Sequence, residues 1–442
     1  MGNQTEGPKT IVSVTPLAVL SDSRTFKEAA SFSRFGYTSI VVEGEASPSS
    51  QTSFSFQLRT IKKRVEGKGE EVSEERTPTR GEKNLRGREK LEASVMRCLS
   101  RLPATVKDPL RFGKFLVLFF YENCLFPLKA IPKASLYYLH APHQFPAICL
   151  LSAWHRVPFV YDAHDFYSQM DPHDDLTDFE RRWFLSFYRK LESWCVQRAA
   201  AVVTVNQGIA RMQQKAFHCN PIVIRNCHDC RLDQEPIQPL REHLKLAPEA
   251  FLLVSLGHGK RSRAIEEAID AMLHLPEFVH LAFLGKNYDP YYEYRRVKRL
   301  EQRVHFVPPV SPNEVVPFVR SADASLILYY SRSVNDEHSL PNSFFQSIAA
   351  ELPLLYPELP EISEIAQKHD LGIPINPRIQ GSISQAVGRL LRDADERARY
   401  RNNLKKVKGI LSWEEEEELL KRLLLNVINR STDRRGMALA KP

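Results

Sequence analysis

Short apolar runs of strand length recur along most of the chain and alternate with segments of helical periodicity. Residues 10–15 and 38–42 are the first two runs, and apolar positions at helical spacing lie between them as far as Gly36. Such runs, connected by helices, are typical of parallel strands buried on both faces. The later runs are residues 136–139, 159–161, 201–205, 251–256, 279–284, 304–307 and 326–328. The pattern predicts an α/β protein with doubly wound sheets.

A polar turn followed by a helix is predicted within residues 339–366. Pro341 suits the first turn of a helix, Ser339 or Asn342 can cap it, and Pro353 marks its end. The apolar positions at helical spacing between the two prolines are Phe344, Phe345, Ile348 and Ala349. A helix N-terminus behind a polar turn is a ready phosphate site. An ordinary buried helix is the alternative interpretation.

Two stretches of the chain lack this alternation of strand-length apolar runs and helical segments. Residues 45–92 begin Ser-rich and continue as a mixed-charge segment with few core-forming residues, which predicts a solvated, disordered insertion. Residues 219–247 contain few apolar residues and three prolines, which predicts a crossing between domains. With 442 residues and 43% hydrophobic content, the chain is long enough for two or three domains.

Charge and cysteine content narrow the class of partner. The net charge of +8 favours anionic partners such as a nucleoside diphosphate or an acidic membrane surface. No basic stripe interleaved with stacking aromatics is present, so nucleic acid is not expected as a partner. Seven scattered cysteines predict reduced thiols in a cytoplasmic protein.

A membrane contact is expected only at the periphery. The longest apolar run, residues 115–121, is far shorter than the ~20 residues of a spanning helix. Residues 109–131 alternate basic and aromatic groups. This pattern suits either a core helix with a solvated basic edge or a surface helix lying against anionic lipid on the inner face of the membrane.

Polar residues follow several of the predicted strands, where ligands bind in open parallel sheets. His140 and His143 follow one strand and His164 follows the next, and each suits either a loop cap or a binding role. Gly257, Lys260 and Arg263 follow the strand at 251–256 and precede a helix. Small residues and cations in that position suit a diphosphate, although a solvated basic loop is the alternative.

Two short motifs suggest a metal. Cys227-His228-Asp229-Cys230 contains zinc-binding residue types, but the chain has no second Cys-x2-Cys pair, so we expect no metal there. Asp393-Ala394-Asp395 precedes a predicted helix, and N-capping explains it better than metal binding.

Three sequence blocks resemble family 4 glycosyltransferases. The run LPNSFFQSIAAELPLLYPELPEISEI is similar to the family's donor-site helix, LPNK-(L/F)-FE-x-(M/I)-AAGLPVV-x-x-x-LPEI. The blocks YDAHDFYS and AAVVTVNQGIARM resemble two further family blocks, and the resemblance extends over about residues 9–44 and 110–425. It implies a GT-B fold, in which two doubly wound Rossmann-like domains face each other across a cleft.

The resemblance also implies a reaction. Family members transfer a sugar from a nucleotide-sugar donor to a carbohydrate or lipid-linked acceptor, and we expect retention of configuration and no metal or other cofactor. The sugar and acceptor side would contain His140, His143 and His164. The donor side would contain Gly257, Lys260, Arg263, Val307, Pro341, Asn342, Ser343 and Gln346.

The chain departs from the family pattern at three positions. Gln346 replaces the ribose-binding Glu, Glu351 replaces a Gly, and His338 stands where the first Glu of a Glu-x7-Glu pair would fall. A catalytically impaired GT-B scaffold or a nucleotide-sugar-binding protein is therefore the alternative, and a nucleotide-sugar epimerase is a third. The expected segments are a first domain at 1–230, a linker at 231–247, a nucleotide-sugar domain at 248–412, a closing helix at 413–429 and a tail at 430–442.

Overall fold

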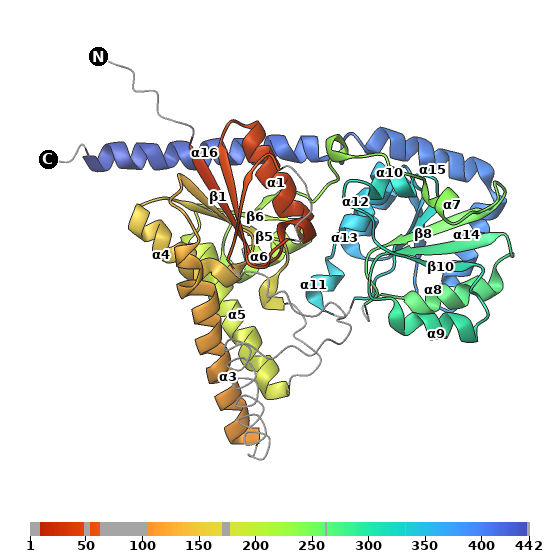
Figure 1. Cartoon of the computed structure of the whole chain (residues 1–442), viewed down its shortest axis with the longest axis horizontal. Coiled ribbons are helices and arrows are strands. Elements are labelled where there is room, and N and C mark those ends of the chain that lie inside the picture. Colours follow the sequence, from red (N-terminus) through yellow and green to blue (C-terminus); the bar gives the residue numbers. More distant parts are fainter. Residues whose placement is uncertain are drawn as a thin grey trace, which may run out of the picture.

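Two parallel β-sheets, each covered by helices, form two domains that lie side by side (Figure 1). The computed structural model describes residues 9–47, 54–61, 104–169, 177–260, 263–331 and 333–439. The first sheet has the order β3-β2-β1-β4-β5-β6-β7 and the second has the order β10-β9-β8-β11-β12-β13. Every strand pairing within them is parallel. The predicted doubly wound α/β architecture is confirmed.

Most strands fall close to the predicted apolar runs, whereas β3, β7, β12 and β13 correspond to none of them. Those of the first sheet are β1 (Thr10–Thr15), β2 (Thr38–Glu43), β3 (Gln57–Thr60), β4 (Leu136–Leu139), β5 (Phe159–Ala163), β6 (Ala201–Thr204) and β7 (Ile222–Val223). Those of the second are β8 (Phe251–Leu256), β9 (Val279–Leu284), β10 (Val304–Val307), β11 (Ala324–Leu326), β12 (Leu354–Pro357) and β13 (Gly372–Ile375).

Helices connect the strands and cover both faces of the sheets. In the first domain they are α1 (Ser23–Arg34), α3 (Ala104–Phe120), α4 (Phe145–His155), α5 (Asp178–Arg198) and α6 (Gln207–Phe217). In the second they are α7 (Leu240–His243), α8 (Ile265–Ala271), α9 (Asp289–Val297), α10 (Val315–Val319), α11 (Val334–Glu337), α12 (Asn342–Ala349), α13 (Pro360–His369), α14 (Ser382–Arg392) and α15 (Ala394–Val407). Asp393 caps α15 by accepting a hydrogen bond from the Glu396 N–H, as predicted.

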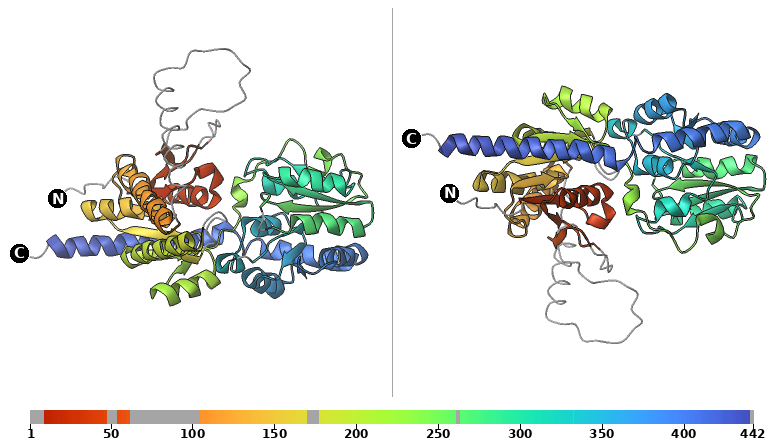
Figure 2. Two further views of the ribbon diagram at one scale, coloured as in Figure 1. Left: turned by 90° about the horizontal axis from the view of Figure 1, so that it is seen from below. Right: turned by 90° about the horizontal axis from the view of Figure 1, so that it is seen from above.

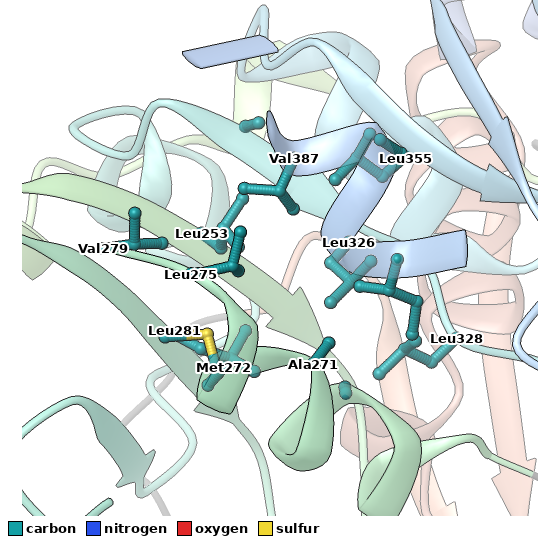
Figure 3. Close-up of a cluster of buried hydrophobic side chains, with 14 of the residues drawn as sticks. Leu253, Ala271, Met272, Leu275, Val279, Leu281, Leu326, Leu328, Leu355 and Val387 are labelled. Carbon is teal, nitrogen blue, oxygen red and sulfur yellow. The ribbon is translucent and has the colours of Figure 1, made fainter. Parts of the chain in front are cut away.

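Both faces of the second sheet are buried. Figure 3 shows one core cluster, in which Leu253 of β8 and Leu281 of β9 pack with Val387 of α14. The neighbouring Leu252 and Val254 belong to a second cluster, because successive side chains of a strand point to opposite faces. This explains why β8 reads as a continuous apolar run.

A long helix, α16 (Trp413–Leu439), begins at the second domain and runs along the first (Figure 2). Trp413 at its start is fully buried with Phe32 and Tyr138, and its indole N–H donates to Ser31 Oγ at 3.0 Å. A helix thus lies where the closing helix is predicted. It extends past the expected end at residue 429 to Leu439, since helical hydrogen bonds join backbone groups within the segment and do not require an apolar face.

Part of the expected disordered insertion is folded. Gln57–Thr60 form β3, which pairs with β2 at the edge of the first sheet. Phe56 is buried, and its ring centroid lies 5.5 Å from that of Phe26 on α1. The composition was dominated by serine, and the prediction overlooked the aromatic residues that give this edge its contact with the core. The rest of the insertion, 48–53 and 62–92, lies outside the described residues.

No helix among the described residues combines the length and the apolar content required to cross a membrane.

Glu351 provides a test of backbone strain. Its φ is +60°, and its carboxylate pairs with Lys408. A left-handed residue with a Cβ costs about 1–2 kcal/mol, whereas an exposed ion pair contributes about 0–1 kcal/mol. We expect Glu351→Gly to raise the free energy of unfolding by about 1 kcal/mol in urea titrations. Glu351→Ala keeps the strained Cβ and loses the ion pair, so it should not stabilise, and equal effects of the two substitutions would contradict the interpretation.

Candidate functional site

A buried ion pair lies where α1 meets the carboxyl end of β5. Arg24 of α1 is 1% exposed, and its Nε and Nη2 atoms each donate to one carboxylate oxygen of Asp162 at 2.8 Å. Its Nη1 atom donates to the Ile224 carbonyl at 2.7 Å. Bidentate geometry and low dielectric make such a pair strong only when its remaining donors are satisfied, as they are here. The pair therefore holds α1 against the carboxyl end of β5 and the segment after β7.

Two of the predicted histidines meet at this ion pair. His140 Nδ1 lies 3.2 Å from His164 Nε2, and His164 Nε2 lies 3.1 Å from Asp162 Oδ2. Glu28 Oε2 is 3.4 Å from His140 Nδ1. His140 follows β4 and His164 follows β5, so adjacent parallel strands bring them together at one sheet edge.

The environment separates the charge states of these groups. Burial would raise the pKa of Asp162, but Arg24 and His164 reverse this and hold it well below its usual value. Burial would lower the pKa of His164, but Asp22 and Asp162 raise it. Burial lowers the pKa of His140 despite its bond to Asp162. The surroundings therefore favour the neutral form of His140 and the protonated form of His164.

The His140 side chain retains one free ring nitrogen. Its Nε2 atom is buried and has no hydrogen-bond partner. A neutral imidazole with an unpartnered nitrogen can donate to or accept from a sugar hydroxyl.

His143 is not part of this cluster. Its ring lies among aromatic side chains, with centroids 5.6 Å from Tyr167 and 5.5 Å from Tyr188. Burial lowers its pKa to about 4. The structure therefore joins two of the three predicted histidines and places the third in an apolar layer.

On the second domain, Arg263 lies at the carboxyl end of β8. Its Nη1 atom donates to the Leu256 carbonyl at 2.6 Å, and its Nη2 atom donates to the Tyr329 hydroxyl at 2.7 Å. Gly257 makes this possible, because a Cβ there would lie 2.2 Å from Arg263 Nη2. The predicted Gly257 and Arg263 are thus in direct contact.

The other predicted donor-side residues lie around the same sheet edge. Lys260 is exposed and its carbonyl accepts from the Arg263 N–H, while Val307 is buried at the end of β10. Pro341 is the N-cap of α12 and not a residue of its first turn, and neither Ser339 nor Asn342 caps the helix through its side chain, so the predicted capping is wrong. Ser343 in the first turn has a buried hydroxyl without a hydrogen-bond partner. Gln346 is half-buried on the next turn.

Short polar bonds hold the two sides against each other. Asn342 Nδ2 donates to Ser23 Oγ at 3.1 Å, and Asn335 Nδ2 donates to Asp165 Oδ1 at 3.0 Å. Ser23 adjoins Arg24, and Asp165 adjoins His164. The N-terminus of α12 therefore faces the histidine cluster across the domain boundary.

The family departure at His338 has a structural partner. His338 Nδ1 lies 3.3 Å from Glu361 Oε1, and the His338 carbonyl accepts from Asn206 Nδ2 at 2.7 Å. Gly208 allows this approach, because a Cβ there would lie 2.3 Å from His338 Nδ1. His338 thus forms part of the contact between the domains.

The histidine cluster is a poor cation site. His140, Asp162 and His164 offer ligand atoms that all lie within 4.8 Å of one another. However, both Asp162 oxygens accept from the Arg24 guanidinium. A metal ion would have to displace that cation, so the arrangement favours hydrogen bonding to a neutral substrate.

An open cavity of about 660 Å³ lies elsewhere on the second domain, between α8 and the loop after β13. None of the predicted site residues lines it. Its polar lining residues include Glu267, Asp270, His274, Tyr330, Arg378 and Gln380.

Sequence reasoning missed the charged residues that support the histidines. Asp22 caps α1 through the Thr25 N–H and faces His164, and Arg24 and Glu28 form an i,i+4 pair. The signal was available in the Arg-x3-Glu spacing of α1 and in the Asp of YDAHD. Neither pattern indicates burial, which is what gives these residues their effect.

Two sequence models of known families match the chain. The sequence model of Glycosyltransferase Family 4 matches residues 86–232, and that of Glycosyl transferases group 1 matches residues 237–407. No curated protein matches the chain in sequence.

Solved structures with the same fold are distant in sequence. The chain is similar to sucrose-phosphate synthase from Thermosynechococcus elongatus, with 12% identity, a TM-score of 0.64, and coverage of 96% of this chain and 100% of that one. It is also similar to Anabaena HepE in complex with UDP and glucose, with 14% identity, a TM-score of 0.61, and coverage of 94% and 99%. A third is the trehalose 6-phosphate synthase from Burkholderia multivorans, with 11% identity, a TM-score of 0.59, and coverage of 97% and 100%. The likeness confirms the predicted GT-B fold.

The two kinds of histidine environment predict opposite pH effects. His143 has a pKa of about 4 in the folded chain and about 6.5 when unfolded, so the unfolded state binds more protons between these values. The stability that wild type has relative to His143→Gln should therefore fall by about 2 kcal/mol between pH 7 and pH 5.

The pKa of His164 is raised, so its contribution is fully present below about pH 6.5 and is lost as the pH rises through the folded value. The stability of wild type relative to His164→Gln should thus be greater at pH 6 than at pH 9. Urea titrations of wild type, His143→Gln and His164→Gln between pH 5 and pH 9 measure both stability differences. The same sign for the two variants would refute the assigned environments.

Proposed function

Because the chain belongs to the family 4 (group 1) glycosyltransferases, we propose that it transfers a sugar from a nucleoside diphosphate to an acceptor hydroxyl with retained anomeric configuration and without a metal ion. The observation that carries the proposal is the contact between the N-terminus of α12 and the start of α1, beside the histidine cluster. Arg263 and the N-terminus of α12 belong to the matched group 1 region, and α12 faces the histidine cluster.

Electrostatic stabilisation of the leaving diphosphate is the main catalytic contribution of the donor side. Negative charge develops on the diphosphate as the sugar departs, and fixed cations and helix N–H groups stabilise it without reorganising. Arg263 and the first N–H groups of α12 supply this charge complement. The Ser343 hydroxyl, buried and unpartnered, offers a further donor. With these groups in place, the mechanism needs no metal ion.

The first domain binds the sugar and the acceptor. Burial lowers the pKa of His140 and favours its neutral form, and its Nε2 atom is buried without a hydrogen-bond partner. A hydroxyl of the transferred sugar that reaches this atom can hydrogen-bond to it. The Arg24–Asp162 pair holds the two histidines in place from beneath. Because this support is buried, it keeps its geometry while the substrate exchanges.

The surface of α3 suits an acceptor held at a membrane. Apolar side chains are exposed along it, including Val117 at 70% and Phe120 at 49%, and Lys114 is exposed beside them. Phe115 packs against Phe184 of α5 with ring centroids 4.4 Å apart, so α3 is anchored on its other face. An apolar stripe with basic neighbours binds anionic lipid surfaces peripherally.

Diphosphate binding tests the donor side. The HepE complex contains UDP, so UDP and GDP are the first probes for calorimetric titration of the full chain. We expect Arg263→Ala to weaken diphosphate binding by about 1.5–3 kcal/mol, the range for hydrogen bonds to charged groups. Arg399→Ala, on the exposed surface of α15, is the control and should bind like wild type. Equal affinities for all three proteins would rule out Arg263 as a ligand.

Gln346 tests the ribose contact. A carboxylate accepts two charge-assisted bonds from a ribose diol, whereas an amide accepts one and donates one. Gln346→Glu should therefore tighten donor binding by about 1 kcal/mol, or raise turnover. Gln346→Ala is the comparison and should weaken binding. If both variants keep the wild-type affinity and turnover, α12 does not form the ribose site.

A binding protein without turnover is the second candidate. It is favoured by His338, whose ring is committed to Glu361 and whose backbone is held by Asn206. Such a protein would bind nucleoside diphosphates yet hydrolyse none of a panel of nucleotide sugars. The panel, assayed beside the titrations above, separates the two candidates.

A further inference from the structure

A cluster of three metal-binding side chains lies on the linker between the domains, away from the histidine cluster. His228, Cys230 and Asp233 each offer one ligand atom, and these atoms all lie within 4.8 Å of one another. His228 Nε2 is 2.7 Å from Asp233 Oδ1. We propose that these residues bind one zinc-class divalent ion, independently of the donor site.

The backbone presents the three ligands together. Residues Cys230–Leu232 form a 3₁₀ turn, and the Asp233 N–H donates to the Cys230 carbonyl at 3.2 Å. In a 3₁₀ turn, side chains three residues apart lie on the same side, so Cys230 and Asp233 face the same way. His228 is fixed separately, since its carbonyl accepts from the Trp413 N–H at 3.0 Å at the start of α16.

Neighbouring residues that could compete are already engaged. Both Asp229 oxygens accept from Arg231, at 2.7 and 2.9 Å. Cys227 is buried, and its thiol faces Glu416. The sequence motif therefore divides into two pairs: Cys227 and Asp229 are structural, whereas His228 and Cys230 join Asp233, which lies outside the motif.

The donor set selects the kind of metal. One thiolate, one imidazole and one carboxylate suit zinc and its neighbours, whereas calcium and magnesium prefer oxygen alone. Cys230 is exposed, and the side chains of His228 and Asp233 are 12% and 14% exposed, so an ion can enter and a water can complete four-coordination.

The location gives the ion a consequence. His228 forms an isolated bridge with Ser412 beside α16, and Gln234, next to Asp233, donates its N–H to Asn313 of the second domain at 2.8 Å. An ion held by His228 and Asp233 would therefore connect the linker to the start of α16. Binding to the folded chain would raise its stability.

Cobalt titration of the full chain tests the proposal. The metal-free, reduced protein is titrated with Co²⁺, and absorption from thiolate-to-cobalt charge transfer is recorded before Zn²⁺ is added in competition. We expect one equivalent to bind with this absorption. Cys230→Ser should abolish the absorption and weaken Zn²⁺ binding at least about tenfold, and Asp233→Asn should weaken it similarly.

Cys219→Ser is the matched control, because this thiol lies outside the cluster and donates to the Gln213 carbonyl. It should retain the cobalt spectrum. Thermal unfolding gives a second readout, in which Zn²⁺ raises the Tm of wild type and of Cys219→Ser but not of Cys230→Ser. The proposal fails if wild type binds no Co²⁺ or if Cys230→Ser keeps the spectrum and the Zn²⁺-dependent rise in Tm.

Discussion

The buried guanidinium of Arg24 is the interaction on which the first domain depends. It joins α1 to Asp162 of β5 and to the Ile224 carbonyl after β7, so one side chain links segments 200 residues apart. An isolated charge could not remain there, because its desolvation would cost several kcal/mol. Asp162 and Glu28 offset that cost, and Asp162 also hydrogen-bonds His164 and, with Asp22, raises the pKa of that histidine. Stability and site chemistry therefore share one carboxylate.

The two domains are joined by contacts of very different strength. Trp413 and the apolar face of α16 are buried permanently against the first domain. By contrast, the hydrogen bonds across the domain boundary include those donated by Asn206, Asn335 and Asn342, and each is worth about 1 kcal/mol. Ligand binding energy is large enough to reorganise such bonds, whereas it could not displace the helix. Movement is therefore expected at these hydrogen bonds and not where α16 packs on the first domain.

The departures from the family pattern have different physical meanings. Glu351 is a matter of backbone conformation, since it adopts the left-handed region that glycine prefers. His338 is a matter of contact between domains through Glu361. Gln346 alone changes the chemistry proposed for the donor, because it exchanges a charged acceptor for a neutral amide on α12.

The sequence by itself determined most of the strands, the two-domain fold, and the placement of His140, His164 and Arg263 after strands, because apolar periodicity and strand ends are local properties. It did not reveal β3, since pairing with β2 depends on a distant partner. Nor did it distinguish His140 from His143, two residues of one loop with opposite surroundings. Burial and charge neighbours come from residues far apart in the chain, such as Arg24 and Asp162, and only the tertiary structure brings these together.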